Sequence, residues 1–330
     1  MPILFVSGVN DRSTIGVTLD GNGQPVYLID GNASVHRRLP LPEDVTATFL
    51  IFGKGVPQHS IEFQKPPSLV FNQIADADTH RGALERCIEL CDRLGTPVIN
   101  HPRQVLKTTR DQVAEMLQGI PAVTVPRTLR FNPRSPDEVL ARARAEAFEF
   151  PFIVRVAGEH GGRRMVRIGT REDAAALHAL PFDGRPFYLS QFVDCRDERG
   201  MYHKQRITFV DGRPLLRHAL FSGDWNIHGR VRDFMLQHET WAMNFAREEA
   251  LETQLMPGLA QAFSEIARRL QLEYFAMDCC IHPDGQMVLF EANANMNVLH
   301  NPFPEMNPRL QRLHAQLQAM LEKYSGERLA

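Results

Sequence analysis

Two acidic residues near the C-terminal end of the chain have the spacing of a shared site. Asp278 stands in the stretch YFAMDCCI, Glu291 and Asn293 follow the apolar run VLF, and Asp284-Gly285 lies between the two stretches. An Asp-Gly pair between apolar runs is a strong signal for a β-hairpin. With a loop of two or four residues, Asp278 faces Glu291, and strand alternation puts Asn293 on the same face. A three-residue loop would break this register.

The opposite face of the predicted hairpin is expected to be apolar, formed by Phe275, Met277, Ile281, Val288 and Phe290. Cross-strand neighbours lie about 4.5–5.5 Å apart, so two facing carboxylates repel each other unless a cation offsets them. Mg²⁺ takes oxygen ligands and is commonly held by one or two carboxylates together with substrate phosphates. The alternative is an exposed hairpin with two solvated acids. We favour the metal site because the flanking residues are apolar.

A glycine-rich turn lies between two predicted strands, in VAGEHGGRRMVRI (156–168). Glycines allow backbone N–H groups to approach a phosphate closely. The turn lacks the Gly-Lys-Ser/Thr of a Walker A loop and does not open a helix, so an ordinary β-turn is an equal alternative. Arg155 before the turn, with Arg163 and Arg164 within it, favours phosphate binding.

Composition excludes several classes of protein. The 330 residues are 43% hydrophobic and 23% charged with a net charge of −2, which indicates a globular protein and gives no sign of nucleic-acid binding. No apolar run approaches the roughly 18 residues that span a bilayer. Five cysteines, two of them adjacent, argue against a disulfide framework and for a reducing cytoplasm. Cys87 and Cys91 are expected to pack in the core rather than bind zinc.

The apolar patterns predict an α/β chain with several lobes. Strands are predicted near 3–8, 25–30, 46–52, 68–74, 97–100, 122–131, 151–158, 165–169, 187–194, 204–212, 213–221 and the acidic hairpin. Helices are predicted near 80–94, 106–117, 135–146, 170 onward, 238–250, 255–271 and 308–323. The capping box Ser135-Pro136-Asp137-Glu138 marks a helix start, and Asp211-Gly212 marks a second hairpin.

The order of these features resembles the ATP-grasp superfamily, near its glutathione-synthetase-type and ribosomal-protein glutamate ligase branch. The resemblance rests on PFIVRVAGEHGG, LSQFVDCRDERG, HKQRITFVDGRP and FAMDCC with LFEANAN, in that order, and covers most of 97–300. It implies an α/β (α+β) fold in which two α+β lobes sandwich ATP. The expected domains are an N-terminal α/β domain (1–100), a central lobe with the glycine loop (101–190) and a C-terminal lobe with the metal site (191–330).

The resemblance also implies roles for matching residues. Asp278, Glu291 and Asn293 would hold one or two Mg²⁺ ions, or Mn²⁺ in their place, on the phosphates of ATP. Lys204 and Arg206 would point at the transferred phosphate as the catalytic cations. Further ATP contacts would come from Arg155, from the loop residues Gly158, His160, Gly161 and Gly162, and from the adenine hinge Gln191, Phe192 and Val193, with Asp197 or Glu198 near the ribose.

Two positions depart from the family pattern. The helix after VINHP usually carries a lysine where this chain has Gln112, so Arg110 or Lys107 would have to supply the cation. Arg155 stands where the family usually has lysine, and a planar guanidinium is not equivalent to an ammonium group.

The implied activity is an ATP-dependent carboxylate-amine ligase that forms an amide or peptide bond through an acyl phosphate. Alternatives are a phosphotransferase on the same fold and a non-catalytic nucleotide-binding module. The expected partners are small carboxylates and amines, amino acids or a peptide among them, with no nucleic acid and no membrane; a homodimer is a reasonable expectation.

Substrate-contacting residues are expected in the polar segment 222–234. His228, Arg230 and Arg232 lie there, and an arginine fork can hold a substrate carboxylate with two hydrogen bonds. A solvated surface loop is an equal alternative. Asn295 is a further candidate for a substrate contact or for support of the site.

Overall fold

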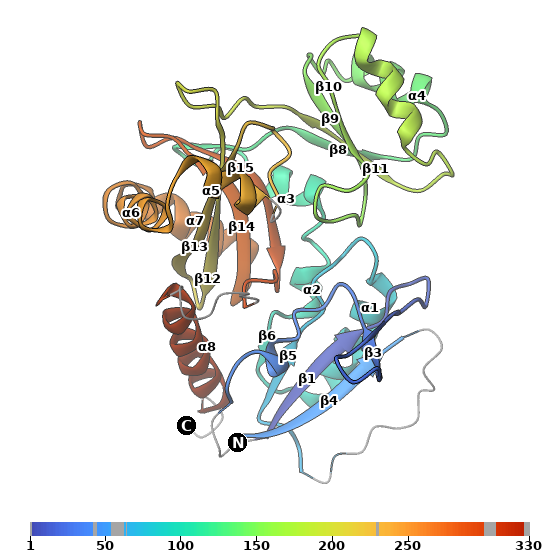
Figure 1. The fold of residues 1–330 in the computed structure, drawn as a ribbon. Helices are drawn as coiled ribbons and strands as arrows, with labels where there is room; N and C mark the ends of the chain where they lie inside the picture. The colour runs from blue at the N-terminus through green and yellow to red at the C-terminus, as the bar shows by residue number, and fades with distance from the viewer. Residues whose placement is uncertain are drawn as a thin grey trace.

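A computed structural model describes residues 2–41, 45–53, 63, 65–228, 231–299 and 308–326. Its strands form three main sheets that follow one another along the chain. Figure 1 shows the N-terminal sheet in blue at the bottom, the central sheet in green at the upper right and the C-terminal sheet beside them. This succession is the basis on which we propose domain boundaries near residues 100 and 190.

The N-terminal sheet is parallel and has the strand order β4-β1-β5-β6. Its strands are β1 (Pro2–Gly8), β4 (Thr46–Phe52), β5 (Leu69–Asn72) and β6 (Val98–Ile99). Leu4 and Val6 pack toward α1 (Arg81–Leu94), whereas Ile3 and Phe5 pack toward α8 (Pro308–Gly326). Burial on both faces explains why β1 is a continuous apolar run. A two-stranded ribbon, β2 (Gly16–Leu19) with β3 (Pro25–Leu28), lies outside this sheet.

The central sheet is antiparallel, with the order β10-β9-β11-β8. It comprises β8 (Thr128–Phe131), β9 (Phe152–Val156), β10 (Met165–Ile168) and β11 (Phe187–Gln191), covered by α4 (Pro136–Ala145) and the 3₁₀ helix η2 (Glu172–Ala179). Ser135 is the N-cap as predicted, because the Glu138 N–H donates to Ser135 Oγ. The Glu138 carboxylate accepts from the N–H of Arg134, one residue before the N-cap. The segment after residue 170 is 3₁₀ rather than α-helical.

The C-terminal sheet has the order β13-β12-β14-β15-β7. It comprises β7 (Val123–Thr124), β12 (Tyr202–Val210), β13 (Arg213–Ser222), β14 (Tyr274–Ile281) and β15 (Met287–Ala294). The predicted Asp211-Gly212 hairpin is confirmed, and both residues have the positive φ of a two-residue primed turn. The sheet packs against α7 (Ala260–Leu270). Four elements precede α7 in the chain: α5 (Arg232–His238), α6 (Trp241–Ala250), a π turn η4 (Leu251–Leu255) and a 3₁₀ turn η5 (Met256–Leu259).

Short helices connect the three sheets. The predicted helix 106–117 corresponds to α3 (Arg110–Met116), which begins four residues later than predicted. A separate short helix, α2 (Pro102–Val105), precedes it, and a 3₁₀ turn η1 (Val35–Arg37) lies in the N-terminal part. Thr109 has extended backbone angles and is the N-cap of α3, which starts the helix at Arg110. Within the described ranges, no helix is long and apolar enough to cross a membrane.

Candidate functional site

The acidic hairpin brings Asp278 and Glu291 directly opposite each other, as predicted, but by a different route. His282 pairs with Gln286, so the loop has three residues, 283–285, and the paired strand ends are one residue out of the expected register. A β-bulge at Phe290 inserts one extra residue and restores the facing pair. The facing carboxylates are therefore confirmed, whereas the even-length loop from which they were derived is wrong.

The bulge also corrects the predicted apolar face. Phe290 is 37% exposed, and Val288 packs with Cys280 on the side of the acidic pair instead of on the core side. The core side is formed by Phe275, Met277, Cys279, Ile281, Met287, Leu289, Ala292 and Ala294. Asn293 pairs with Ala276 and shares the face of Asp278 and Glu291.

Two cations from β12 hold Asp278. Arg206 donates from Nε to Oδ1 at 2.6 Å and from Nη2 to Oδ2 at 2.8 Å, and Lys204 Nζ lies 3.1 Å from Oδ2. Burial raises the pKa of Asp278, but Arg206 and Lys204 together lower it well below its usual range, so the group is ionised. The structure thus brings both predicted catalytic cations to the predicted metal-binding carboxylate.

Of the two basic residues predicted as substitutes for the lysine missing at Gln112, Arg110 contacts the acidic pair. Its guanidinium forms an ion pair with Glu291 from the start of α3. Burial raises the pKa of Glu291, and Arg110 is the main group that lowers it again, with a net shift downward. Gln112 accepts a hydrogen bond from Thr109, and Lys107 is hydrogen-bonded to Gln104 on the surface, so neither takes this place.

Arg155 is buried on β9 and is incompletely paired. Its Nη2 donates to the Glu159 carbonyl oxygen, while its Nε is buried without a hydrogen-bond partner. Burial and the nearby Arg110 lower the pKa of Arg155. A buried guanidinium with an unsatisfied N–H is costly unless an anion or water completes it. An anion bound in the cleft next to Arg155 would satisfy this donor.

These groups border a cleft of about 1320 Å³. That volume exceeds the 300–1,000 Å³ of a typical small-molecule site and leaves room for two ligands. Nine arginine and lysine side chains and seven carboxylates line this cleft, so its wall carries a surplus of two positive charges. Four of these cations lie around Asp278 and Glu291: Arg110, Arg155, Lys204 and Arg206. The cleft is also lined by Asn293, the glycine loop, the segment 190–193, His228 and the N-terminal residues Asn10, Asp76 and Asp78.

The glycine loop needs glycine at two contact points. Gly158 has φ 73° and Gly162 has φ 72°, which is the left-handed region. A Cβ on Gly158 would lie 2.3 Å from Thr79 Cγ2, and a Cβ on Gly162 would lie 2.4 Å from Asn226 Oδ1. The loop therefore fits between the N-terminal domain and the C-terminal lobe, with backbone in close approach on both sides.

Two aspartates that sequence reasoning missed hold this loop. Asp76 Oδ2 lies 3.0 Å from His160 Nε2, and Asp78 accepts from the Gly158 N–H at 3.3 Å. Burial raises the pKa of Asp78 even though Tyr188 donates a hydrogen bond to it. The signal in the sequence was the pair of acids just after a buried parallel strand, where ligand-facing loops often lie.

The predicted hinge Gln191–Val193 borders the cleft at the end of β11. The Gln191 side chain donates to the carbonyl oxygens of Glu149 and Pro151, so it fixes the hinge. The Arg167 guanidinium carbon lies over the Phe192 ring, 4.4 Å from the ring centroid. The rings of Phe192 and Trp225 form a T-shaped contact. Asp197, the ribose candidate, accepts backbone bonds within its own turn and contacts His203.

Only the comparison with solved structures found proteins similar to this chain. No family model matches the sequence, and no curated protein matches it significantly. D-alanyl-alanine synthetase A from Vibrio cholerae O1 biovar eltor str. N16961 is similar in structure, with a TM-score of 0.56 and 11% identity over 99% of this chain and 97% of the other. A RimK domain protein ATP-grasp from Sphaerobacter thermophilus DSM 20745 is also similar, with a TM-score of 0.52 and 15% identity over 97% of this chain and 99% of the other. The chain has the ATP-grasp fold.

A third structure with this fold, D-alanine–D-alanine ligase from Bacillus anthracis complexed with ATP, has a TM-score of 0.50 and 12% identity over 98% and 96% of the two chains. The fold predicted from the order of the motifs is confirmed over nearly the whole chain.

Within the ATP-grasp fold, Asn295 joins the N-terminal domain to the C-terminal lobe. It is 1% exposed, its Nδ2 donates to the carbonyl oxygens of Asn72 and Ile74, and its Oδ1 accepts from Asn100. Asn100 also bonds the backbone N–H and carbonyl of Tyr274. The Asn295 amide is thus fully engaged in an interdomain network, and we assign it to support of the site rather than to substrate contact.

The other substrate candidates have different positions. His228 borders the cleft, Arg232 begins α5, and Arg230 lies outside the described residues. Lys204 Nζ donates to the Ile227 carbonyl at 2.6 Å, which ties this segment to the acidic pair. Residues 225–228 therefore form the part of the cleft wall next to the glycine loop.

Proposed function

We propose that the protein is an ATP-dependent carboxylate-amine ligase that releases ADP and phosphate. The observation that carries the proposal is the facing pair Asp278 and Glu291, with Asn293 beside it, surrounded by four cations in one cleft. A surplus of positive charge beside two carboxylates suits a polyphosphate bound with divalent metal.

The donor set fits Mg²⁺. Asp278, Glu291 and Asn293 offer only oxygen ligands from one face of the hairpin. An ionised carboxylate has about four lone-pair positions. Arg206 and Lys204 take three of them on Asp278, and Arg110 contacts one oxygen of Glu291, so both groups keep room for a metal. When bound, Mg²⁺ would neutralise phosphate charge and orient the nucleotide.

The remaining residues position the reactants. The unsatisfied Nε of Arg155 and the Gly158–Gly162 backbone would hold phosphate oxygens, and Lys204 and Arg206 would stabilise the charge of the transferred group. A substrate carboxylate oxygen attacks the γ-phosphorus while the bond to ADP breaks. An amine then attacks the acyl carbon, and phosphate leaves. This route needs no nucleophilic side chain, only proximity and charge. The neighbours named as a D-alanine–D-alanine ligase and a D-alanyl-alanine synthetase support amino acids as a substrate class.

A screen of ADP release tests the proposal. The protein with Mg-ATP is incubated with pairs of amino acids, short peptides and small acids, and products are identified by mass spectrometry. The expected result is ADP formation that requires both a carboxylate and an amine, with a product lighter than the two substrates by one water. A stable phosphorylated product without an amine requirement would replace the ligase assignment with a phosphotransferase.

Replacing Arg155 with alanine is expected to weaken ATP binding by about 10- to 100-fold, because a charge-assisted contact to phosphate is lost. Arg155→Lys should recover part of the affinity, since lysine retains the charge but not the planar fork. Isothermal titration calorimetry measures both. Arg142→Ala on the exposed side of α4 is the control and should bind as wild type. Equal affinity in Arg155→Ala would remove Arg155 from the phosphate site.

Replacing Gly158 with alanine is expected to weaken ATP binding by about 10-fold, because the new Cβ collides with Thr79 and displaces the loop. Gly184→Ala is a matched control: φ is 87° there, yet nothing lies within 4 Å of the added atom. Both variants share the backbone strain, so only the collision differs between them. If the two variants bind ATP equally well, loop docking does not contribute to nucleotide binding.

A further inference from the structure

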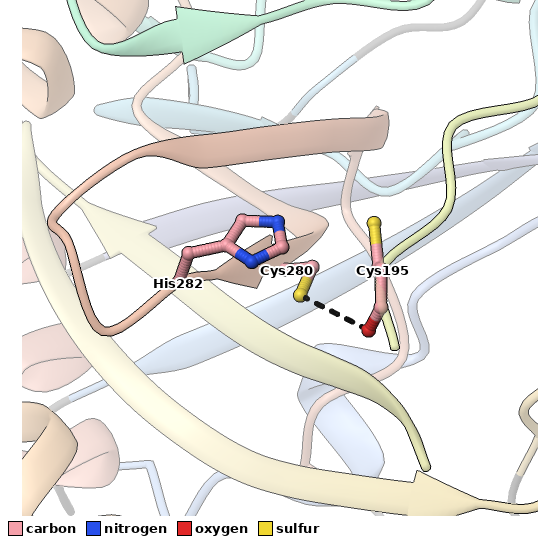
Figure 2. Close-up of side chains that lie close together, drawn as sticks. All are labelled: Cys195, Cys280 and His282. Atoms are coloured by element: carbon pink, nitrogen blue, oxygen red, sulfur yellow. Dashed lines mark hydrogen bonds between the residues drawn. The ribbon is translucent and has the colours of Figure 1, made fainter. Parts of the chain in front are cut away.

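Three side chains that bind soft metals lie together beyond the acidic pair. The thiol sulfurs of Cys195 and Cys280 and a ring nitrogen of His282 are all within 4.8 Å of one another. Figure 2 shows Cys195 on the segment after β11, and Cys280 and His282 on the hairpin. Among the residues that the structure describes, this is the one group of three or more His, Cys, Asp and Glu side chains close enough to share an ion.

The surroundings of the three side chains leave their metal-binding atoms weakly engaged. Both thiols are buried, at 3% and 2% exposure, beside Val193 and Val288. The sulfur of Cys280 lies 4.0 Å from the Cys195 carbonyl oxygen, and that of Cys195 lies 3.6 Å from the Val193 carbonyl oxygen. Such long contacts are weak. No hydrogen bond from another described residue reaches the His282 ring, so its nitrogens are available.

The backbone holds these groups in place before any ion binds. Cys280 lies in β14 and packs with Val288, its partner across the hairpin. His282 follows at the end of the strand, where its N–H donates to Gln286 and its carbonyl accepts from Gly285. Two residues apart on a strand, the two side chains point to the same side.

We propose that Cys195, Cys280 and His282 bind one Zn²⁺ ion. Two thiolates and an imidazole are a known zinc ligand set that leaves a fourth position for water. With Zn–S bonds of about 2.3 Å, sulfurs in a tetrahedral site lie roughly 3.7 Å apart, so only a small closure of the cluster is needed. Binding replaces two S–H bonds with two S–Zn bonds and releases two protons to the buffer, with no change in oxidation state.

The zinc would join two parts of the molecule. Cys195 is two residues beyond Val193 in the hinge, and Cys280 is two residues beyond Asp278. The ion would therefore fasten the segment between the central and C-terminal lobes to the strand that carries the acidic pair. The inference does not depend on the proposed ligase activity, because metal on the protein can be measured without turnover.

The test uses the full chain, reduced and stripped of metal, with excess Mg²⁺ present to occupy oxygen sites. Wild type is expected to bind one equivalent of Zn²⁺, and Co²⁺ in its place should give a thiolate-to-cobalt charge-transfer band and the d–d bands of a four-coordinate ion. Cys280→Ala and His282→Ala should each lower zinc affinity by about 100-fold or more. A rise in melting temperature with Zn²⁺ should occur in wild type and vanish in Cys280→Ala.

Two control variants separate this site from its neighbours. Cys279→Ala removes an adjacent buried thiol on the opposite face and should leave the cobalt spectrum unchanged. Glu291→Gln should also leave it unchanged, which distinguishes this site from the acidic pair. The proposal is overturned if wild type binds no zinc, if the cobalt–thiolate band survives in Cys280→Ala, or if mass spectrometry finds Cys195 and Cys280 joined as a disulfide in the protein prepared under reducing conditions.

Discussion

Glu291→Gln is expected to lower Mg²⁺-dependent ADP formation by about 100-fold or more, while the protein stays folded. Glutamine keeps the size of the side chain and one oxygen, but it removes the negative charge that faces Asp278 and pairs with Arg110. If the acidic pair holds the metal, the loss falls mainly on Mg²⁺ affinity and on the chemical step. Steady-state ADP release at several Mg²⁺ concentrations measures both.

Glu248→Gln is the matched control for this experiment. Glu248 is also buried and paired with arginine: its Oε2 accepts from Arg309 at 2.8 Å and its Oε1 from the Ala219 N–H at 2.8 Å. It lies in the same lobe but outside the cleft. Glu248→Gln should lower stability and leave turnover close to wild type. If both variants lose activity equally, the effect of Glu291→Gln comes from damage to the lobe rather than from lost metal binding.

Asn100→Ala is expected to have the largest effect on stability, about 2–5 kcal/mol. The substitution leaves two buried groups without partners, the N–H of Tyr274 and Oδ1 of Asn295. The carbonyl of Tyr274 loses one of its two donors and keeps the Asn295 N–H. Asn100 also has φ 54°, a conformation that asparagine tolerates better than alanine. Urea denaturation followed by circular dichroism measures the change in the free energy of unfolding.

Two further variants define the cause of that loss. Asn100→Gly relieves the backbone strain but still lacks the amide, so it should remain strongly destabilised. Asn132→Ala removes an exposed amide that makes a single hydrogen bond to the Gly184 carbonyl, and it should cost less than about 0.5 kcal/mol. A stable Asn100→Gly protein would show that strain, and not the polar network, accounts for the effect.

Local signals in the sequence were sufficient for the elements that depend on neighbours in the chain. The helix at Pro136 starts where the capping box puts it, and the Asp211-Gly212 turn closes its hairpin. The facing pair Asp278 and Glu291 was predicted too, although two errors of one residue cancelled. A bulge at Phe290 has no local signature, because an apolar residue there fits a regular buried strand equally well.

The remaining features depend on contacts between segments far apart in the chain. Asp76 meets His160 across 84 residues, and Cys195 meets Cys280 across 85. Neither pair has a spacing motif, so only the packing of the lobes brings them together. Asn295 looked like a candidate ligand because polar residues ending a strand often face a site. Its burial against Asn72 and Asn100 is likewise a product of domain packing.

The central claim is that the Asp278–Glu291 pair and the cations around it bind a metal–nucleotide complex. Titration calorimetry with a non-hydrolysable ATP analogue, in Mg²⁺ and in chelator, tests it without knowledge of the substrates. The account predicts binding of one analogue per chain in Mg²⁺, weakened by about 10-fold or more in chelator and in Glu291→Gln. No binding in Mg²⁺, or equal binding by wild type and Glu291→Gln under every condition, would contradict it.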